Sequence, residues 1–162
     1  MKILVINLGW EQQPLIAALK SAGHSLHGIH CTAPEQPENF ESVRILDLRD
    51  LGGIRAHARA LRPEAVVSDQ CDYSMFAQAV VSEDLGLPGP RVAQAQLACN
   101  KWLQRDRSRE AGLDIPAYAC VTSLAEARSK AETIGYPVIL KPVDNRGSFG
   151  VNKVDDPGTL AE

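Results

Sequence analysis

The chain has 162 residues, 44% of them hydrophobic and 23% charged, which is typical of a globular protein with a sizeable core. Its net charge of −3 argues against a protein that coats nucleic acid or a membrane surface, so we expect neither partner. No stretch approaches the ~18 apolar residues of a membrane span, and the start lacks the pattern of a signal peptide. The four cysteines are widely separated, with no C-x-x-C pair, so we expect reduced thiols and a cytoplasmic protein.

The first half of the chain alternates between strand and helix patterns. The predicted strands are short aliphatic or alternating runs at 2–7, 25–30, 43–48 and 65–68. The predicted helices between and after them lie at 15–22, 54–61 and 73–85. This alternation predicts an α/β fold, a Rossmann-like, right-handed, doubly wound parallel sheet.

Ligands of such sheets bind beyond the carboxyl ends of the strands. The residues that follow two of the predicted strands there are polar, small or aromatic, and we expect them to face a substrate: Gly9, Trp10, Glu11, Asp69 and Asp72. The alternative is that they serve only in loops and helix caps.

The pattern changes after Pro90. Helices are predicted at 92–99, 101–111 and 124–134, with Asn100 and Ser123 as N-caps. Strands are predicted at 117–122, 138–140 and 151–154. Three arginines at 105, 107 and 109 are interleaved with acidic residues, and we interpret them as a solvated helix face rather than a binding patch.

A glycine-rich turn joins the last two predicted strands. Lys141 ends the first strand, and Gly147, Ser148 and Gly150 follow. Glycines let backbone N–H groups approach phosphate oxygens, and a lysine supplies a point charge. The G-x-x-x-x-G-K-[ST] and G-x-G-x-x-G fingerprints are both absent, which argues against a P-loop NTPase and a nicotinamide dehydrogenase. An ordinary hairpin remains the alternative for this turn.

Five motifs in order resemble the ATP-grasp superfamily. They are Asn100-Lys101, Ala111-Gly112-Leu113 with Pro116, Gly135-Tyr136-Pro137-Val138, Lys141-Pro142, and Gly147-Ser148-x-Gly150-Val151. The preceding unit, which closes with Leu85-Gly-Leu-Pro-Gly89, is similar to the pre-ATP-grasp domain of that family.

The resemblance implies an organisation and a function. It implies a pre-ATP-grasp domain at 1–92, linking helices at 93–113 and a truncated α+β lid subdomain at 114–162. It implies an ATP-dependent carboxylate–amine ligase with an acyl-phosphate intermediate, a small carboxylate substrate such as an amino acid, and a homodimer. ATP phosphates would contact Lys101, Lys141, Gly147, Ser148 and Gly150. The ligands of Mg²⁺ would lie beyond residue 162, as would the catalytic residues, so we expect this chain to be inactive alone.

Two alternatives stay open at this stage. The first is a non-catalytic, Rossmann-like binding or regulatory module whose glycine turn is merely structural. The second concerns His24, His27 and His30 with Cys31, which look like a metal cluster. On a strand, His27 points to the face opposite the other two histidines, so we expect no metal site in this chain.

Overall fold

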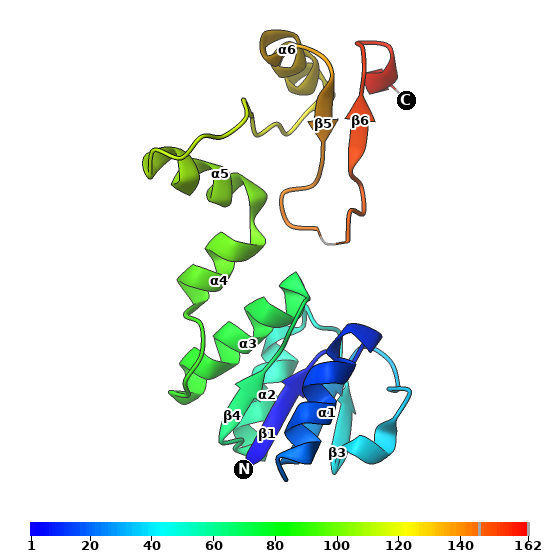
Figure 1. The fold of residues 1–162 in the computed structure, drawn as a ribbon, viewed down its shortest axis with the longest axis vertical. Coiled ribbons are helices and arrows are strands. Elements are labelled where there is room, and N and C mark those ends of the chain that lie inside the picture. The colour runs from blue at the N-terminus through cyan, green and yellow to red at the C-terminus, as the bar shows by residue number, and fades with distance from the viewer. Residues whose placement is uncertain (146, 162) are drawn as a thin grey trace. The chain divides into compact units, whose positions relative to one another are not determined.

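The structure is a computed structural model that describes residues 1–145 and 147–161 (Figure 1). The chain forms two compact units, Met1–Cys99 and Asn100–Glu162. The finer division at 1–92, 93–113 and 114–162 stays a prediction.

The first unit is a four-stranded parallel sheet with helices, which confirms the predicted α/β class. Its strands are β1 (Lys2–Ile6), β2 (Ser25–His30), β3 (Ser42–Ile45) and β4 (Ala65–Val67). Its α-helices are α1 (Gln13–Ser21), α2 (Leu51–Leu61), α3 (Asp72–Leu85) and α4 (Val92–Cys99), and short 3₁₀ turns lie at Trp10–Gln12 and Pro37–Asn39. The strand order is β3-β2-β1-β4, and all three pairings are parallel.

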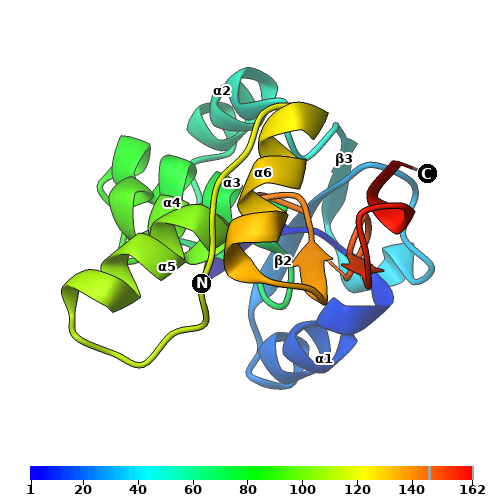
Figure 2. The ribbon, with the colours of Figure 1, turned by 90° about the horizontal axis from the view of Figure 1, so that it is seen from above.

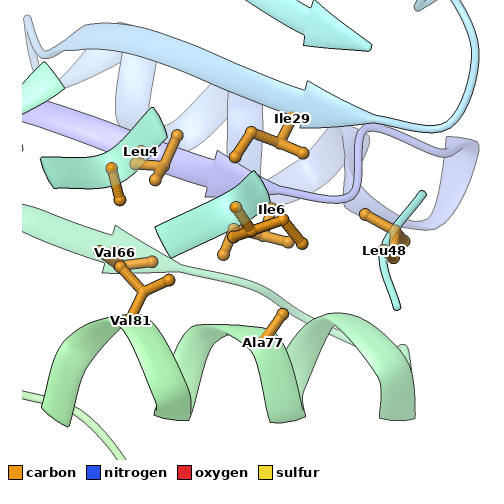
Figure 3. Close-up of a cluster of buried hydrophobic side chains, with 9 residues drawn as sticks. Leu4, Ile6, Ile29, Leu48, Val66, Ala77 and Val81 are labelled. Atoms are coloured by element: carbon orange, nitrogen blue, oxygen red, sulfur yellow. The ribbon is translucent and has the colours of Figure 1, made fainter. Parts of the chain in front are cut away.

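Alternate residues of β1 pack into two separate clusters of buried side chains, one on each face of the sheet. Leu4 and Ile6 of β1 pack with Ile54 of α2 and Ala77 of α3 in a cluster of buried side chains, most of which Figure 3 labels. Ile3 and Val5 pack on the other face, with Ile16 of α1 among their neighbours. Because side chains alternate across a strand, α1 covers one face of the sheet and α2 and α3 cover the other. The sheet is therefore doubly wound, as predicted.

The strand β3 ends earlier than the sequence predicts. Alternating residues suggested a strand to Leu48, but the chain leaves the sheet after Ile45. A turn begins at Asp47, whose carboxylate accepts the backbone N–H of Arg49 at 2.9 Å and whose carbonyl accepts that of Asp50. Leu48 still reaches the core, with 7% of its surface exposed, but it does so from the turn.

The second unit contains two helices and an antiparallel hairpin. The elements are α5 (Lys101–Glu110), α6 (Leu124–Ile134), β5 (Val138–Leu140), β6 (Asn152–Val154) and a 3₁₀ turn at Thr159–Ala161. Asn100 caps α5 by accepting the backbone N–H groups of Trp102 and Leu103, each at 3.0 Å. Ser123 caps α6 in the same way, while Glu126 accepts from the backbone of Thr122 at 2.8 Å. Both predicted N-caps are confirmed.

The predicted strand at 117–122 is wrong. This segment runs from α5 to α6 as an extended chain, which Figure 2 shows passing beside α6. Its apolar residues favour an extended backbone, but an extended chain becomes a strand only when a neighbouring strand pairs with it. Among the described residues of this unit, strand pairing is confined to β5 and β6.

Two further observations concern the chemistry of the chain. All four cysteines are free, with Cys31 and Cys120 exposed and Cys71 buried. Within residues 1–145 and 147–161, every helix is too short or too polar to cross a membrane.

Candidate functional site

The five predicted substrate residues lie at one edge of the parallel sheet. Gly9, Trp10 and Glu11 follow β1, and Asp69 and Asp72 follow β4. These strands are neighbours, and the strand order reverses between them, because the chain moves outward to β2 and β3 before it returns to β4. Such a reversal is the place where open α/β sheets bind ligands.

Asn7 organises the turn after β1. It is 2% exposed and has a positive φ of 74°, a conformation that asparagine tolerates better than most residues. Its Oδ1 accepts the backbone N–H of Gly9 at 3.2 Å, and its Nδ2 donates to Glu11 Oε1 at 2.8 Å. The Glu11 carboxylate is therefore held by the turn itself, whereas the Trp10 side chain beside it is 80% exposed.

Gln12 links the segment after β1 to the segment after β4. It was not among the residues predicted from the sequence. Its side chain is fully buried, with 0% exposed. Its Oε1 accepts the backbone N–H of Asp69 at 2.9 Å, and its Nε2 donates to the carbonyl of the same residue. The side-chain amide of Gln12 thus satisfies both the N–H and the C=O of Asp69, as the backbone of a neighbouring strand would. The spacing of Gln12 to Ile16, four residues, is the signal that places it on the buried face of the helical segment.

The histidine cluster belongs to the sheet. His27 is 7% exposed, its Nδ1 lies 2.8 Å from Ser42 Oγ, and its Nε2 lies 3.6 Å from a carboxylate oxygen of Glu41. His30 accepts the backbone N–H of Leu8 with its Nδ1 at 3.2 Å. In the part of the chain that the structure describes, no three His, Cys, Asp or Glu side chains are grouped to hold a metal ion.

The glycine turn of the second unit is built from left-handed residues. Positive φ angles occur at Gly147 (59°), Ser148 (60°) and Gly150 (72°). A Cβ at Gly150 would lie 3.0 Å from Cγ of Pro142, a tight contact that adds to the strain of the left-handed backbone there. The Val151 N–H donates to the Ser148 carbonyl at 3.1 Å and closes the turn.

Lys101 is hydrogen-bonded to residues 143–145, the segment that leads into this turn. Its backbone N–H donates to the carbonyl of Val143 at 2.8 Å, and its Nζ donates to the carbonyl of Asn145 at 2.5 Å. The predicted phosphate-binding lysine is thereby bound to Asn145, 44 residues away in the sequence and just before the predicted phosphate-binding turn.

Lys101 and Lys141 line the same pocket, whose volume is about 650 Å³. Its walls come from the start of α5, the extended segment, α6 and β5. Among the described residues, the cationic side chains that line it are Lys101, Arg105, Lys130 and Lys141. None of the described lining residues carries a carboxylate. The charged lining groups therefore favour an anionic group on a ligand, while most of the lining is apolar.

One wall of the pocket is aromatic and held rigidly. The rings of Trp102 and Tyr118 have centroids 5.3 Å apart and are tilted by 57°. The Tyr118 hydroxyl donates to Asp106 Oδ1 at 2.8 Å, and Arg109 lies over the ring at 5.8 Å. Burial and the bond to Asp106 raise the pKa of Tyr118, so its hydroxyl stays protonated at neutral pH.

Comparisons with known proteins place this geometry in context. No family model matches the chain. The uncharacterized protein y4rH of Sinorhizobium fredii is 38% identical over 82 residues, which are 51% of this chain and 17% of that protein. Formate-dependent phosphoribosylglycinamide formyltransferase of Mycolicibacterium gilvum is 26% identical over 99% of this chain and 41% of its own length. D-alanine–D-alanine ligase B of Chromobacterium violaceum is 34% identical over 48% of this chain and 26% of its own length.

Solved structures share the fold across nearly the whole chain. The L-amino acid ligase of Bacillus licheniformis has a TM-score of 0.80 at 21% identity, over 98% of this chain and 40% of that one. The biotin carboxylase domain of the Hydrogenobacter thermophilus 2-oxoglutarate carboxylase, solved with MgADP and bicarbonate, has a TM-score of 0.76 at 23% identity. That match covers 99% of this chain and 38% of the other.

The formyltransferase and the D-alanine–D-alanine ligase confirm the resemblance to the ATP-grasp superfamily, whose carboxylate–amine ligases they represent. The structural likeness confirms the fold of the N-terminal part of such ligases. The chain spans less than half the length of these relatives.

Proposed function

We propose that this chain is the N-terminal part of an ATP-dependent carboxylate–amine ligase and supplies contacts to the ATP phosphates. One observation carries the proposal: Lys101 and Lys141, forty residues apart, line one pocket whose described residues carry no carboxylate, and Lys101 binds the backbone of Asn145, which leads into the glycine turn. The chain length supports it as well, because the formyltransferase relative is matched over 41% of its length.

Each phosphate-binding group has a distinct role in this proposal. Lys101 and Lys141 stabilise the negative charge that develops on the transferred phosphoryl group. The backbone N–H groups of Gly147, Ser148 and Gly150 approach the terminal phosphates closely, since the left-handed turn exposes them. Transfer of the phosphoryl group to a carboxylate gives an acyl phosphate, from which an amine then displaces phosphate.

The substrate would bind at the edge where β1 and β4 end. Glu11 and Asp69 there are carboxylates suited to the ammonium group of an amino acid, while Gly9, Trp10 and Asp72 shape the same edge. Mg²⁺, when bound, would neutralise part of the phosphate charge. The family resemblance implies that the ligands of Mg²⁺ lie in a later part of such ligases, and on that ground we expect no turnover by this chain alone.

Isothermal titration of the 162-residue chain with a non-hydrolysable ATP analogue tests the phosphate contacts. We expect weak binding, in the micromolar-to-millimolar range, from a few charge-assisted hydrogen bonds of about 1.5–3 kcal/mol each. Lys101→Ala and Lys141→Ala should each weaken binding roughly tenfold or more.

Lys153→Ala is the matched control. Lys153 lies on β6 in the same unit, but its Nζ pairs with Asp155 and it does not line the pocket. Equal affinities for the wild type and both pocket variants would refute the phosphate assignment, as would an equal loss in the control.

A further inference from the structure

Arg105 differs from the two arginines that follow it on α5. Arg107 is exposed and pairs with Glu110 at 3.0 Å, and Arg109 pairs with Asp106 at 2.8 Å. Arg105 is only partly exposed and lines the cationic pocket. Among the ion pairs of the described residues, none includes Arg105. Arg105 is still partly exposed, so the predicted solvated helix face is not contradicted, but its place on the pocket separates it from Arg107 and Arg109.

Helix geometry explains the difference. Arg105 follows Lys101 by four residues, so the two side chains share one face of α5, and that face borders the pocket. The charge of Arg105 also acts on Tyr118, whose ring forms the aromatic wall. Lys101, Arg105 and Tyr118 thus line one pocket.

Among the described residues, no ion pair joins Arg105 to a carboxylate, although the Asp106 carboxylate and Arg105 both act on Tyr118. Lys130, on the opposite wall, has Glu126 one helical turn away, and the two groups interact electrostatically. Removing a cation from water has a cost in free energy unless an anion compensates for it. An anionic ligand bound in this pocket would supply such compensation.

We infer that Arg105 is a third cationic contact to the phosphates of the nucleotide, beside Lys101 and Lys141. This inference rests on the proposed function and adds to it a residue that the family motifs do not include. The planar guanidinium can donate two parallel N–H groups to one phosphate, which an ammonium cannot do. Arg105 therefore selects for a polyphosphate rather than for the nucleoside.

The test compares two probes on the 162-residue chain, inorganic tripolyphosphate and adenosine. Binding is followed by calorimetry for the wild type, Arg105→Gln, Arg105→Lys and Arg107→Gln. Arg105→Gln should weaken tripolyphosphate binding roughly tenfold or more and leave adenosine binding unchanged. Arg105→Lys should recover part of the loss, and the exposed control Arg107→Gln should stay within about twofold of the wild type.

The outcomes separate this inference from the proposed function. If Lys101→Ala weakens tripolyphosphate binding and Arg105→Gln does not, the inference fails and the proposed function stands. An equal loss for both probes, or an equal loss in Arg107→Gln, overturns the inference, because either would indicate a structural or non-specific effect. If the wild type binds neither tripolyphosphate nor an ATP analogue, both fail. A thermal unfolding midpoint for Arg105→Gln equal to that of the wild type shows that the variant is folded.

Discussion

The Nζ of Lys101 donates to the backbone carbonyl of Asn145, which lies at the entrance to the glycine turn. The N-terminus of α5 is thereby joined to the loop after β5, and the backbone bond from Lys101 to Val143 adds a second link. An ammonium has three N–H donors, so a bond to Asn145 is compatible with a bond to phosphate. One side chain can therefore both position the turn and bind the ligand.

Lys101→Met should loosen this loop even without nucleotide. Methionine keeps the aliphatic stem of lysine and removes the charge-assisted bond to Asn145, worth about 1.5–3 kcal/mol. We expect backbone amides at 143–145 to exchange with solvent roughly tenfold faster or more, as measured by hydrogen–deuterium exchange. Unchanged exchange at these amides, or an equal change in Lys153→Met, would show that the bond does not restrain the loop.

Gly150→Ala should damage both the fold and the binding of ATP. Its φ of 72° costs an alanine about 1–2 kcal/mol, and the added Cβ meets Pro142 at 3.0 Å. Gly112→Ala is the control, because Gly112 has a φ of 71° with no atom within 4 Å of an added Cβ. Chemical denaturation should show a loss in both variants, and calorimetry should show weaker ATP binding only for Gly150→Ala. Equal ATP affinities in the two variants would argue that the turn does not bind phosphate.

Gln12→Leu should destabilise the first unit by about 1–3 kcal/mol. The substitution leaves the N–H and C=O of Asp69 without the amide that satisfies them. Urea denaturation measures the loss. The control Gln96→Leu lies on an exposed position of α4 and should stay within about 0.5 kcal/mol of the wild type. A loss no larger than that of the control would mean that the Gln12 amide contributes little to the stability of this edge.

Asp84 should make stability depend on acid pH. Its carboxylate accepts from Arg59 at 2.8 and 2.6 Å and from Arg55 at 2.6 Å, and these bonds lower its pKa from 3.8 to about 2. A carboxyl whose pKa is lower in the folded state stabilises the fold above the unfolded pKa, and this stabilisation disappears as the pH falls from about 4 to 2.

Asp84→Asn should therefore lower the thermal midpoint at pH 7, and its difference from the wild type should shrink over the window from pH 4 to 2. Asp47→Asn provides a comparison, since the pKa of Asp47 is also about 2 but its pair with Arg49 lies within one exposed turn. We expect a smaller effect there, because exposed pairs contribute little. A pH-independent difference for Asp84→Asn would contradict the role of the charge.

The sequence was sufficient for those features that depend on local patterns. Aliphatic runs at 2–7 and 65–68 identified β1 and β4, and the helix caps Asn100 and Ser123 were recognisable from residue type alone. Features that depend on a distant neighbour were missed. Arg105 could not be separated from Arg107 without the wall that faces it, and 117–122 could not be recognised as unpaired. The positive φ of Ser148 was also hidden, because nothing in a serine indicates that conformation.

The most direct test of the phosphate-binding account is amide chemical-shift mapping of the 162-residue chain during titration with a non-hydrolysable ATP analogue. The account predicts that the largest shifts fall on Gly147, Ser148 and Gly150 and on the backbone around Lys101 and Lys141. Shifts confined to residues 7–12 and 69–72 would contradict it and would favour a Rossmann-like binding module with a structural glycine turn. Saturating analogue without shifts in the turn would refute the ATP contact itself.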